Sequence, residues 1–427
     1  MAGRIQLESS GLQDRFFTVD PEYTHFLKSF KKHSNFSIQY VDLSPENEAD
    51  FGKTVKFKIP QNQGDLLRTV SVKVTLPEIG TSLMGYVDSV GHALIEYADI
   101  IIGDTVVQRL TSDYLQIYSE HFVTQTKQKA LEELVGKYSE RVASTRVSDK
   151  EILCHLGASQ SEVDYFIDLP FYFYNNPELA IPLCAITKQE VEIEIKLRNY
   201  QDLIVKGDGT YVDIAPEVLN IKNFELCLET IFLDPCERIK IMKTKKDYII
   251  TQNQQEVFDV AQDINSASFK LQFVNPVKEL YFVIQRQGSV GTGEGEFVTP
   301  FDYDNTLQIS NGKLVLYENL DYLTLDLDGQ PIITEDTGNV IFLKAIQGGI
   351  HHSKTQLLRR FYSYSFALEP EKWYPTGQVN FSLVKEQILN LSLTPCTDYP
   401  RQIRVYAISY NILRVSEGTA KTLFNDN

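Results

Sequence analysis

The sequence has few cysteines, and their spacing fits neither a metal knuckle nor a disulfide framework. The count is odd and no two lie two or three residues apart, at Cys154, Cys184, Cys227, Cys236 and Cys396. Neither a zinc knuckle nor a secreted disulfide scaffold therefore fits the chain. We expect reduced, mostly buried thiols in a protein that folds in a reducing cytoplasm.

Long apolar runs and an excess of basic residues are also absent. No run approaches the ~18 apolar residues of a membrane span, and residues 1–11 have no apolar core of a secretory signal. The 41 Lys and Arg are outnumbered by 57 Asp and Glu, for a net charge of −16. Non-specific binding to phosphates is therefore disfavoured, and we expect no direct contact with a genome.

The apolar residues that are present are arranged for β-strands. Hydrophobic residues make up 43% of the sequence, which is enough to form a core. A chain of 427 residues is longer than one compact core usually accommodates, so we expect two domains of about 200 residues. Apolar and polar residues alternate along segments of both halves: 54–59, 69–76, 190–197, 269–273, 323–327 and 389–393. This pattern places one face in a core and one in water, as in antiparallel sheets.

Turns and a few short helices complete the pattern. Asn311-Gly312 and Asp328-Gly329 are typical of hairpins. Helical spacing predicts a helix around Leu131–Tyr138, and a second short helix is expected from Pro235 to about Lys246. The chain is therefore predicted to be all-β, as two β-sandwiches with short helical insertions and a boundary at 216–240.

No arrangement of residues predicts catalysis, a cofactor or a metal. The loop 291–295 is glycine-rich, but it has glutamates where a phosphate loop needs a lysine. His351-His352 lacks the alternation and the neighbouring carboxylate of a cupin metal site, so we interpret it as a loop or surface pair. We expect a protein that is not an enzyme, with no catalytic residue, no cofactor and no metal.

Two basic clusters and three sequons leave alternatives open. The clusters surround His33 and cover 240–246, and they are either solvated faces or contacts with an acidic partner, anionic lipid or, less favoured, nucleic acid. Glycosylation is possible at Asn35, Asn380 and Asn390, but only if the chain meets a glycosyltransferase.

Short blocks along the chain resemble, in the same order, the major capsid proteins of nucleocytoplasmic large DNA viruses. The N-terminal blocks contain Gln13, Asp14, Pro21, His33, Asn35 and Phe36. The middle blocks contain Gly64, Asp65, Gly91, His92, Pro170, Phe171 and Pro177. The C-terminal blocks contain Pro375, Gly377, Asn380, Phe381, Tyr406, Tyr410, Asn411 and Arg414. The residues at 383–386 and 419–421 depart from the usual family pattern, which indicates a divergent lineage.

The resemblance implies two consecutive antiparallel jelly rolls in one chain, a double jelly-roll capsid protein. The expected parts are a base segment at 1–34, jelly rolls at 35–220 and 248–427, and a connection with a short helix at 221–247. Three chains would form a pseudo-hexameric capsomer, and capsomers would tile an icosahedral shell. Because loops on a rigid scaffold usually carry exposure and function, we expect some of the segments 110–160, 287–305 and 329–352 to form the outward-facing top of the capsomer.

The resemblance also implies partners and a location. They are a homotrimer, neighbouring capsomers, minor capsid and penton proteins, and an inner viral membrane at the base, in a virion assembled in the host cytoplasm. Two alternatives stay open: a capsid protein of another double jelly-roll virus such as a virophage, and a β-sandwich carbohydrate- or receptor-binding protein.

Overall fold

The computed structural model describes most of the chain. The described ranges are 2–9, 11–27, 31–79, 84–137, 143–147, 150–155, 161–174, 176–206, 219–287, 300–301, 303, 308–310, 313–315, 318–353, 361–396 and 399–424. Two units separate, residues 1–36 and 37–427. The first unit contains the short helices α1 (Ala2–Glu8) and α2 (Leu12–Thr18). The expected turns at 291–295 and 311–312 lie outside the described residues.

The first sandwich has two facing four-stranded sheets. One contains, in spatial order, β1 (Phe36–Leu43), β12 (Asn223–Leu233), β3 (Leu66–Leu76) and β9 (Val163–Asp168). The other contains β2 (Thr54–Lys58), β10 (Val191–Leu197), β5 (Ile95–Ile102) and β6 (Thr105–Thr111).

The second sandwich follows the same plan. One sheet contains β13 (Lys246–Val260), β23 (Arg401–Ser416), β15 (Pro276–Arg286) and β20 (Tyr362–Ser365), with β21 (Val379–Asn380) and β24 (Thr419–Thr422) at its margins. The other contains β14 (Ser266–Lys270), β22 (Gln387–Leu393), β18 (Leu320–Leu327) and β19 (Gln330–Ile333). With β21 and β24 left out and the other eight strands of each sandwich numbered in chain order, both sandwiches pair first–eighth–third–sixth in one sheet and second–seventh–fourth–fifth in the other. This shared order supports a duplication that sequence repetition alone could not establish.

The predicted alternation explains the strands. In β10 the four apolar side chains from Val191 to Leu197 are buried, whereas the charged residues between them face outward. Glu194 stands opposite Lys56 of β2, and their charged atoms lie 3.1 Å apart. The expected all-β class and the Asp328-Gly329 hairpin are therefore confirmed.

Helices and small sheets lie in the connections between strands. The helices are α3 (Val90–Leu94), α4 (Ser112–His121), α5 (Gln125–Val135), α6 (Pro235–Lys243), a π-helix (Phe342–Ile346) and α7 (Gln347–His351). Single 3-10 turns occupy Pro177–Leu179, Leu183–Ala185, Tyr200–Asp202 and Phe381–Leu383. The small sheets contain β11 (Ile204–Lys206), β4 (Met84–Val87), β8 (Lys150–His155) and β7 (Ala143–Val147), and β16 (Gln308–Ser310) with β17 (Lys313–Val315). The two expected helices correspond to α5 and α6. No helix in the described part is long and apolar enough to cross a bilayer.

The range 221–247 is more than a connection. It contains β12, which pairs with β3 from Asn223 to Ile231 and so belongs to the first sandwich. The last residue of the range, Asp247, lies in β13 of the second sandwich. Burial alternates along the first half of β12, from Asn223 to Leu228, as expected for a strand of a sandwich. We therefore propose that the connection is only 234–245, where α6 lies.

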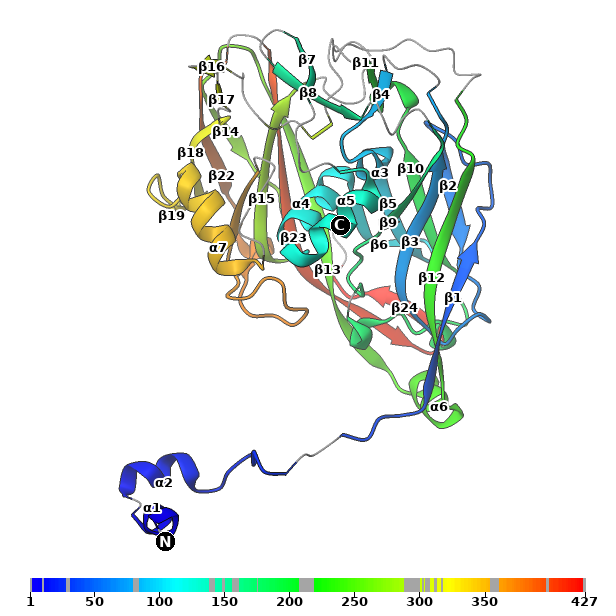
Figure 1. The fold of residues 1–427 in the computed structure, drawn as a ribbon, viewed down its shortest axis with the longest axis vertical. Helices are drawn as coiled ribbons and strands as arrows, with labels where there is room; N and C mark the ends of the chain where they lie inside the picture. The colour runs from blue at the N-terminus through cyan, green and yellow to red at the C-terminus, as the bar shows by residue number, and fades with distance from the viewer. Residues whose placement is uncertain are drawn as a thin grey trace. The chain divides into compact units, whose positions relative to one another are not determined.

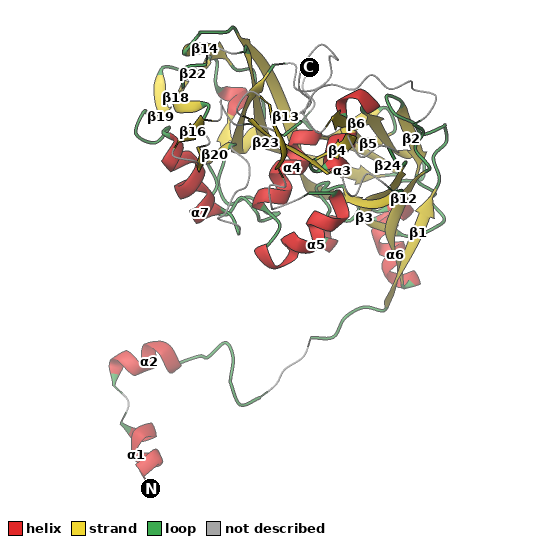
Figure 2. Ribbon diagram, turned by 45° about the horizontal axis from the view of Figure 1, so that its top comes forward, coloured by secondary structure: helices red, strands yellow, loops and turns green. Residues whose placement is uncertain are grey.

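The two sandwiches are packed through a shared interior. The core of the first sandwich continues into side chains of the second, including Tyr281, Phe361 and Tyr406. A separate core fills the second sandwich. Figures 1 and 2 show α4 lying between the two sandwiches, beside β15 and β23.

Candidate functional site: the junction between the sandwiches

Helix α4 forms the centre of the junction. Thr111 caps it, because its Oγ1 accepts a hydrogen bond from the amide of Tyr114 at 3.4 Å. Every residue of α4 except Tyr118 is buried. A helix that is buried on all sides needs internal partners for each polar side chain. Two side chains of α4 contact the second sandwich: Asp113, near the start of the helix, through hydrogen bonds and an ion pair, and His121, at its end, through ring contacts.

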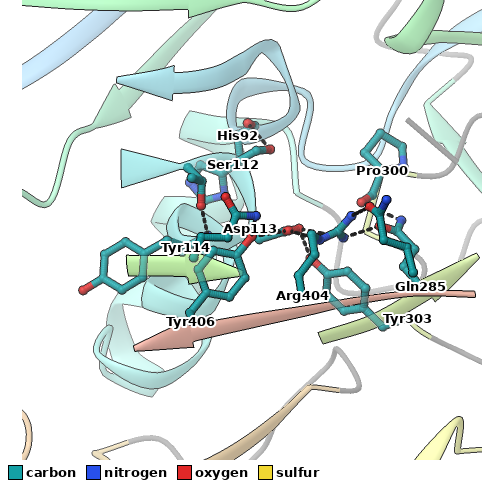
Figure 3. Close-up of polar contacts among 12 residues, drawn as sticks. His92, Ser112, Asp113, Tyr114, Gln285, Pro300, Tyr303, Arg404 and Tyr406 are labelled. Carbon is teal, nitrogen blue, oxygen red and sulfur yellow. Dashed lines mark hydrogen bonds and ion pairs between the residues drawn. The ribbon is translucent and has the colours of Figure 1, made fainter. Parts of the chain in front are cut away.

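Asp113 is the acceptor of a buried polar network (Figure 3). Its Oδ2 lies 2.6 Å from Nε of Arg404, and the hydroxyls of Tyr303 and Tyr406 each donate to the carboxylate at 2.7 Å. Arg404 also donates to the side-chain oxygen of Gln285. Gln285 in turn donates to the carbonyl of Pro300 at 2.9 Å. Residues 291 positions apart in the chain therefore form one hydrogen-bonded unit.

The electrostatics of this network hold the charges in place. Burial raises the pKa of Tyr303 and Tyr406 well above the ordinary value, and the Asp113 carboxylate raises both further, so the phenols remain hydrogen-bond donors. Burial alone would lower the pKa of Arg404, but Asp113 more than reverses this. The junction thus contains an ion pair between Arg404 and Asp113 whose side chains are largely shielded from water.

A second polar cluster lies at the end of α4. The ring of His121 stacks on that of His352 with 3.9 Å between centroids. Nε2 of His352 lies 2.6 Å from Oε1 of Glu279, whose other oxygen accepts from Tyr281 at 2.8 Å. The pKa of His352 is raised to about 9: burial alone would lower it, but Glu279 and Glu371 outweigh that effect.

The interpretation of His351-His352 as a loop or surface pair is therefore wrong for His352. His351 is half-buried and ends α7, whereas His352 is only 6% exposed. The carboxylate that sequence inspection found lacking comes from β15, 73 residues away. A search limited to the neighbouring sequence could not find it.

Main-chain contacts extend the junction. The amide of Lys188 donates to the carbonyl of Gly418 at 2.9 Å, and the amide of Ala420 donates to the side chain of Gln189 at 2.7 Å. The side chain of Gln252 in β13 donates to the carbonyl of Val107 at 3.0 Å. The junction is thus polar as well as apolar, and it fixes both orientation and distance.

Several of the family-motif residues support α4 and its neighbours. Gly91 has no room for a side chain, because a Cβ would lie 3.1 Å from the carbonyl oxygen of Val135. His92 is buried, its Nδ1 lies 3.0 Å from Oε1 of Gln116, and its carbonyl accepts from Ser112 at 2.9 Å. Burial lowers the pKa of His92 to about 4, so the ring is neutral at neutral pH. These residues position the helix.

Gly64 and Asp65 connect the first sandwich to the connection. A Cβ at Gly64 would lie 2.5 Å from Cβ of Thr230 in β12. The Asp65 carboxylate accepts from the amide of Leu233 at 2.9 Å and lies 3.0 Å from Nε of Arg238 in α6. Asp65 therefore fixes the point at which the chain leaves the first sandwich.

The remaining motif residues are mostly structural in their surroundings. Phe171 and Phe381 are core residues, and the chain at Gly377 approaches the carbonyl of Phe366 too closely for a Cβ. Pro170 is buried, Pro177 begins a 3-10 turn, and Pro375 is exposed.

The motif residues of β23 differ in their surroundings. Asn411 donates to Gln252, and Tyr410 lies under the ammonium of Lys278. Arg414 forms a bidentate pair with Asp247 at 2.7 Å on an open face. Asn380 caps a 3-10 turn, and the side chain of Asn390 donates to Thr324. Glycosylation at these two asparagines stays an untested prediction.

The motif residues of the N-terminal segment make few contacts among the described residues. All are exposed: Gln13, Asp14, Pro21, His33, Asn35 and Phe36. Asp14 accepts from the amide of Gly11 at 2.7 Å and so caps α2. Of the thiols expected to be buried, Cys184 and Cys396 are buried, Cys227 is half-buried and Cys236 is exposed.

The residues that join the sandwiches were missed by sequence inspection: Asp113, His121, Glu279, Gln285, Tyr303 and Arg404. One signal was available for Arg404. It is a charged residue at the start of a predicted strand whose next four residues, Val405 to Ile408, are apolar, and a buried arginine needs a charged partner.

Comparisons with known proteins define the class. The family described as "Major capsid protein N-terminus" matches residues 24–234, and "Large eukaryotic DNA virus major capsid protein" matches residues 237–421. The major capsid protein of Pyramimonas orientalis virus is 28% identical, with 97% of each chain covered. That of Phaeocystis pouchetii virus is 25% identical, covering 97% of this chain and 98% of the relative.

A solved structure confirms the fold. The quasi-atomic model of the PBCV-1 virus capsid superposes with a TM-score of 0.74 at 21% identity, over 94% of this chain and 100% of that one. Two sandwiches of one topology, packed through a buried junction, define a double jelly-roll protein. The chain belongs to the family of major capsid proteins of large eukaryotic DNA viruses. It is a structural component of the virion capsid.

Proposed function

We propose that three copies of the chain form a capsomer of pseudo-hexagonal outline, which tiles an icosahedral shell. Two similar sandwiches per chain give six in a trimer, and six similar units suit a hexagonal position in a shell. The buried junction supports this proposal, because a hinge between the sandwiches would make the shape of the capsomer variable. Neighbouring capsomers could then not form the same contacts at every position. Neighbouring capsomers and minor capsid and penton proteins would supply the remaining contacts, and assembly would take place in the host cytoplasm.

The main observation in support of the trimer is an exposed apolar stripe on the helix 340–351. Ile341 and Ile346 are five residues apart across the π-helix and Ile350 follows four residues later, so the three lie in line. They are 72%, 41% and 69% exposed. Leu368, 78% exposed, lies beside them, because its carbonyl is 3.1 Å from Nδ1 of His351. Contiguous exposed apolar surface of this kind marks a protein contact.

Replacing Ile341 and Ile350 by glutamate should break the trimer. Burying unpaired carboxylates in an apolar contact is strongly unfavourable. Light scattering coupled to size exclusion should give three chains of 48.8 kDa, about 146 kDa, for the wild type and one chain for the variant. Leu383→Glu, an equally exposed leucine outside the stripe, is the matched control and should remain trimeric. If the Ile341→Glu/Ile350→Glu variant remained trimeric, the apolar stripe would not be part of the trimer contact.

We further propose that the N-terminal segment lies at the capsomer base against the inner viral membrane. Residues 2–27 expose many large apolar side chains: Ile5, Leu7, Leu12, Phe16, Phe17, Val19, Tyr23, Phe26 and Leu27. Aromatic residues exposed beside basic ones favour a membrane surface.

Removing aromatic side chains from α2 should weaken membrane binding. The purified full-length protein should float with vesicles containing anionic lipid, and Phe16→Ser/Phe17→Ser should reduce the floated fraction several-fold. Phe424→Ser, an exposed phenylalanine at the other end of the chain, controls for apolar surface in general. Equal flotation of both variants would argue against this base contact.

A further inference from the structure

We propose that His121, Glu279 and His352 bind one divalent transition-metal ion of the Zn²⁺ class, which joins the two sandwiches within a chain. Each residue offers one ligand atom, and the three atoms lie within 4.8 Å of one another. Imidazole nitrogen and carboxylate oxygen are ligands that Zn²⁺ prefers. All three residues are buried, at 1%, 0% and 6% exposed.

The separations are close to those that a tetrahedral ion requires. Bonds of 2.0–2.1 Å place neighbouring ligand atoms about 3.3 Å apart. No separation in the cluster exceeds 4.8 Å, so no pair of ligand atoms has to close by more than about 1.5 Å to bind the ion. Nε2 of His352 and Oε1 of Glu279 lie 2.6 Å apart as a hydrogen-bonded pair, so the ion would replace the shared proton and open this pair by about 0.7 Å.

Groups outside the cluster hold two of the ligands in orientation. The free oxygen of Glu279 accepts from the hydroxyl of Tyr281 at 2.8 Å. The other ring nitrogen of His352, Nδ1, lies 3.6 Å from Oε1 of Glu371, which itself accepts from the amide of Ser353 at 2.7 Å. A metal-bound histidine usually donates its second N–H to a carboxylate, and a metal-bound carboxylate is usually hydrogen-bonded.

The backbone also favours a cation at this place. The pairing of β15 with β23 slips between Val277 and Glu279, and such a bulge redirects the side chain that follows it. His121 is the last residue of α4, where the helix dipole favours positive charge. A cleft is lined by Phe122 and Lys278, the chain neighbours of His121 and Glu279, and by Glu371. The fourth ligand would be a water molecule, and the burial assigns the ion a structural role.

An ion pair without metal is the competing arrangement. His352 as an imidazolium and Glu279 as a carboxylate would also satisfy one another. The other charged groups facing the cluster are Glu371 and Lys278, and the Lys278 ammonium donates to the carbonyl of Pro370 at 2.8 Å. The two arrangements differ in whether the protein retains a stoichiometric metal.

Metal content of the purified full-length protein tests the proposal. Metal is first removed by dialysis against EDTA, and one equivalent of Zn²⁺ per chain is then added. After unbound metal is removed, plasma mass spectrometry should find about one zinc ion per chain. Co²⁺ added in place of Zn²⁺ should give the visible absorption bands of a tetrahedral site. His121→Gln and His352→Gln should each lose the bands and most of the ion, whereas His351→Gln, the half-buried neighbour, should keep both.

A second measurement protects the test against variants that fail to fold. Zn²⁺ should raise the thermal midpoint of the EDTA-treated wild type, because an ion that binds only the folded chain stabilises it. Absence of stoichiometric metal, no tetrahedral Co²⁺ spectrum and no Zn²⁺ effect on unfolding would overturn the proposal and leave the ion pair. All three ligands belong to one chain, so the result does not depend on the trimer.

Discussion

Replacing Arg404 by methionine should destabilise the protein by about 3–5 kcal/mol, because it leaves the Asp113 carboxylate buried without its countercharge. Tyr303 and Tyr406 would still donate to that carboxylate, but two neutral donors do not replace a guanidinium. The loss should appear in urea unfolding followed by the fluorescence of Trp373. This is the sole tryptophan of the chain, and it packs against the core that spans the junction.

The chain provides a matched control for this prediction on the same strand. Arg414 also forms a bidentate pair with an aspartate, Asp247, but the two side chains are 29% and 41% exposed. Exposed pairs contribute little, so Arg414→Met should cost under about 1 kcal/mol. Similar losses for the two arginines would show that burial at the junction is not what makes Arg404 important.

A double variant separates the charge from the packing. In Asp113→Asn/Arg404→Met no buried charge remains, so the double variant should be more stable than Arg404→Met alone. Coupling energies of about 0.5–3 kcal/mol are typical for residues in one network. If the double variant instead loses the sum of the single losses, the network does not act as a unit.

The sequence predicted the strands well because their cause is local. An alternating segment such as Val191–Leu197 has one buried and one exposed face, and periodicity records this directly. Helix α5 has an apolar stripe and was predicted, whereas α4 is buried nearly all round and has no such stripe to detect. The order of the strands came only from the family resemblance, since periodicity does not report partners.

The junction could not be predicted because its chemistry depends on distant pairs. Asp113 looks unremarkable within its own segment, the signal at Arg404 does not say which acid it pairs with, and only the packing of the sandwiches brings the two together. The motif residues that the sequence did single out, such as Gly91 and Asp65, mostly shape turns and connections. The recognisable blocks therefore marked the scaffold, whereas the local sequence did not identify the partners of the charged contacts across the junction.

Gly338→Ala should disrupt the second sandwich. It should thereby weaken both the trimer contact proposed for the helix 340–351 and the metal site proposed at His352, which follows this helix. An added Cβ would lie 1.7 Å from the carbonyl oxygen of Leu323, a backbone atom that cannot move aside cheaply. Forcing this contact should cost at least about 3 kcal/mol, the upper part of the range for overpacking. Thermal unfolding of the purified variant would measure the loss.

The control variant separates steric overlap from backbone conformation. Gly329 has φ +74° but open space around its Cβ position, so Gly329→Ala carries only the cost of a left-handed residue, about 1–2 kcal/mol. Equal thermal midpoints for the two variants would show that the loop at Gly338 moves away at little cost.

The steric effect at Gly338 should extend beyond local stability. The Gly338 carbonyl accepts from the amide of Leu323 at 3.0 Å, and the next residue, Asn339, caps the helix through the amide of Phe342 at 2.9 Å. That helix carries Ile341 and Ile350 and is followed at once by His352. A displaced cap should therefore lower both the trimer fraction and the bound metal in one variant. A variant that lost the trimer but kept the metal, or the reverse, would show that the helix does not move as a rigid body. A rigid helix that shifts at its start would displace both Ile341 and His352.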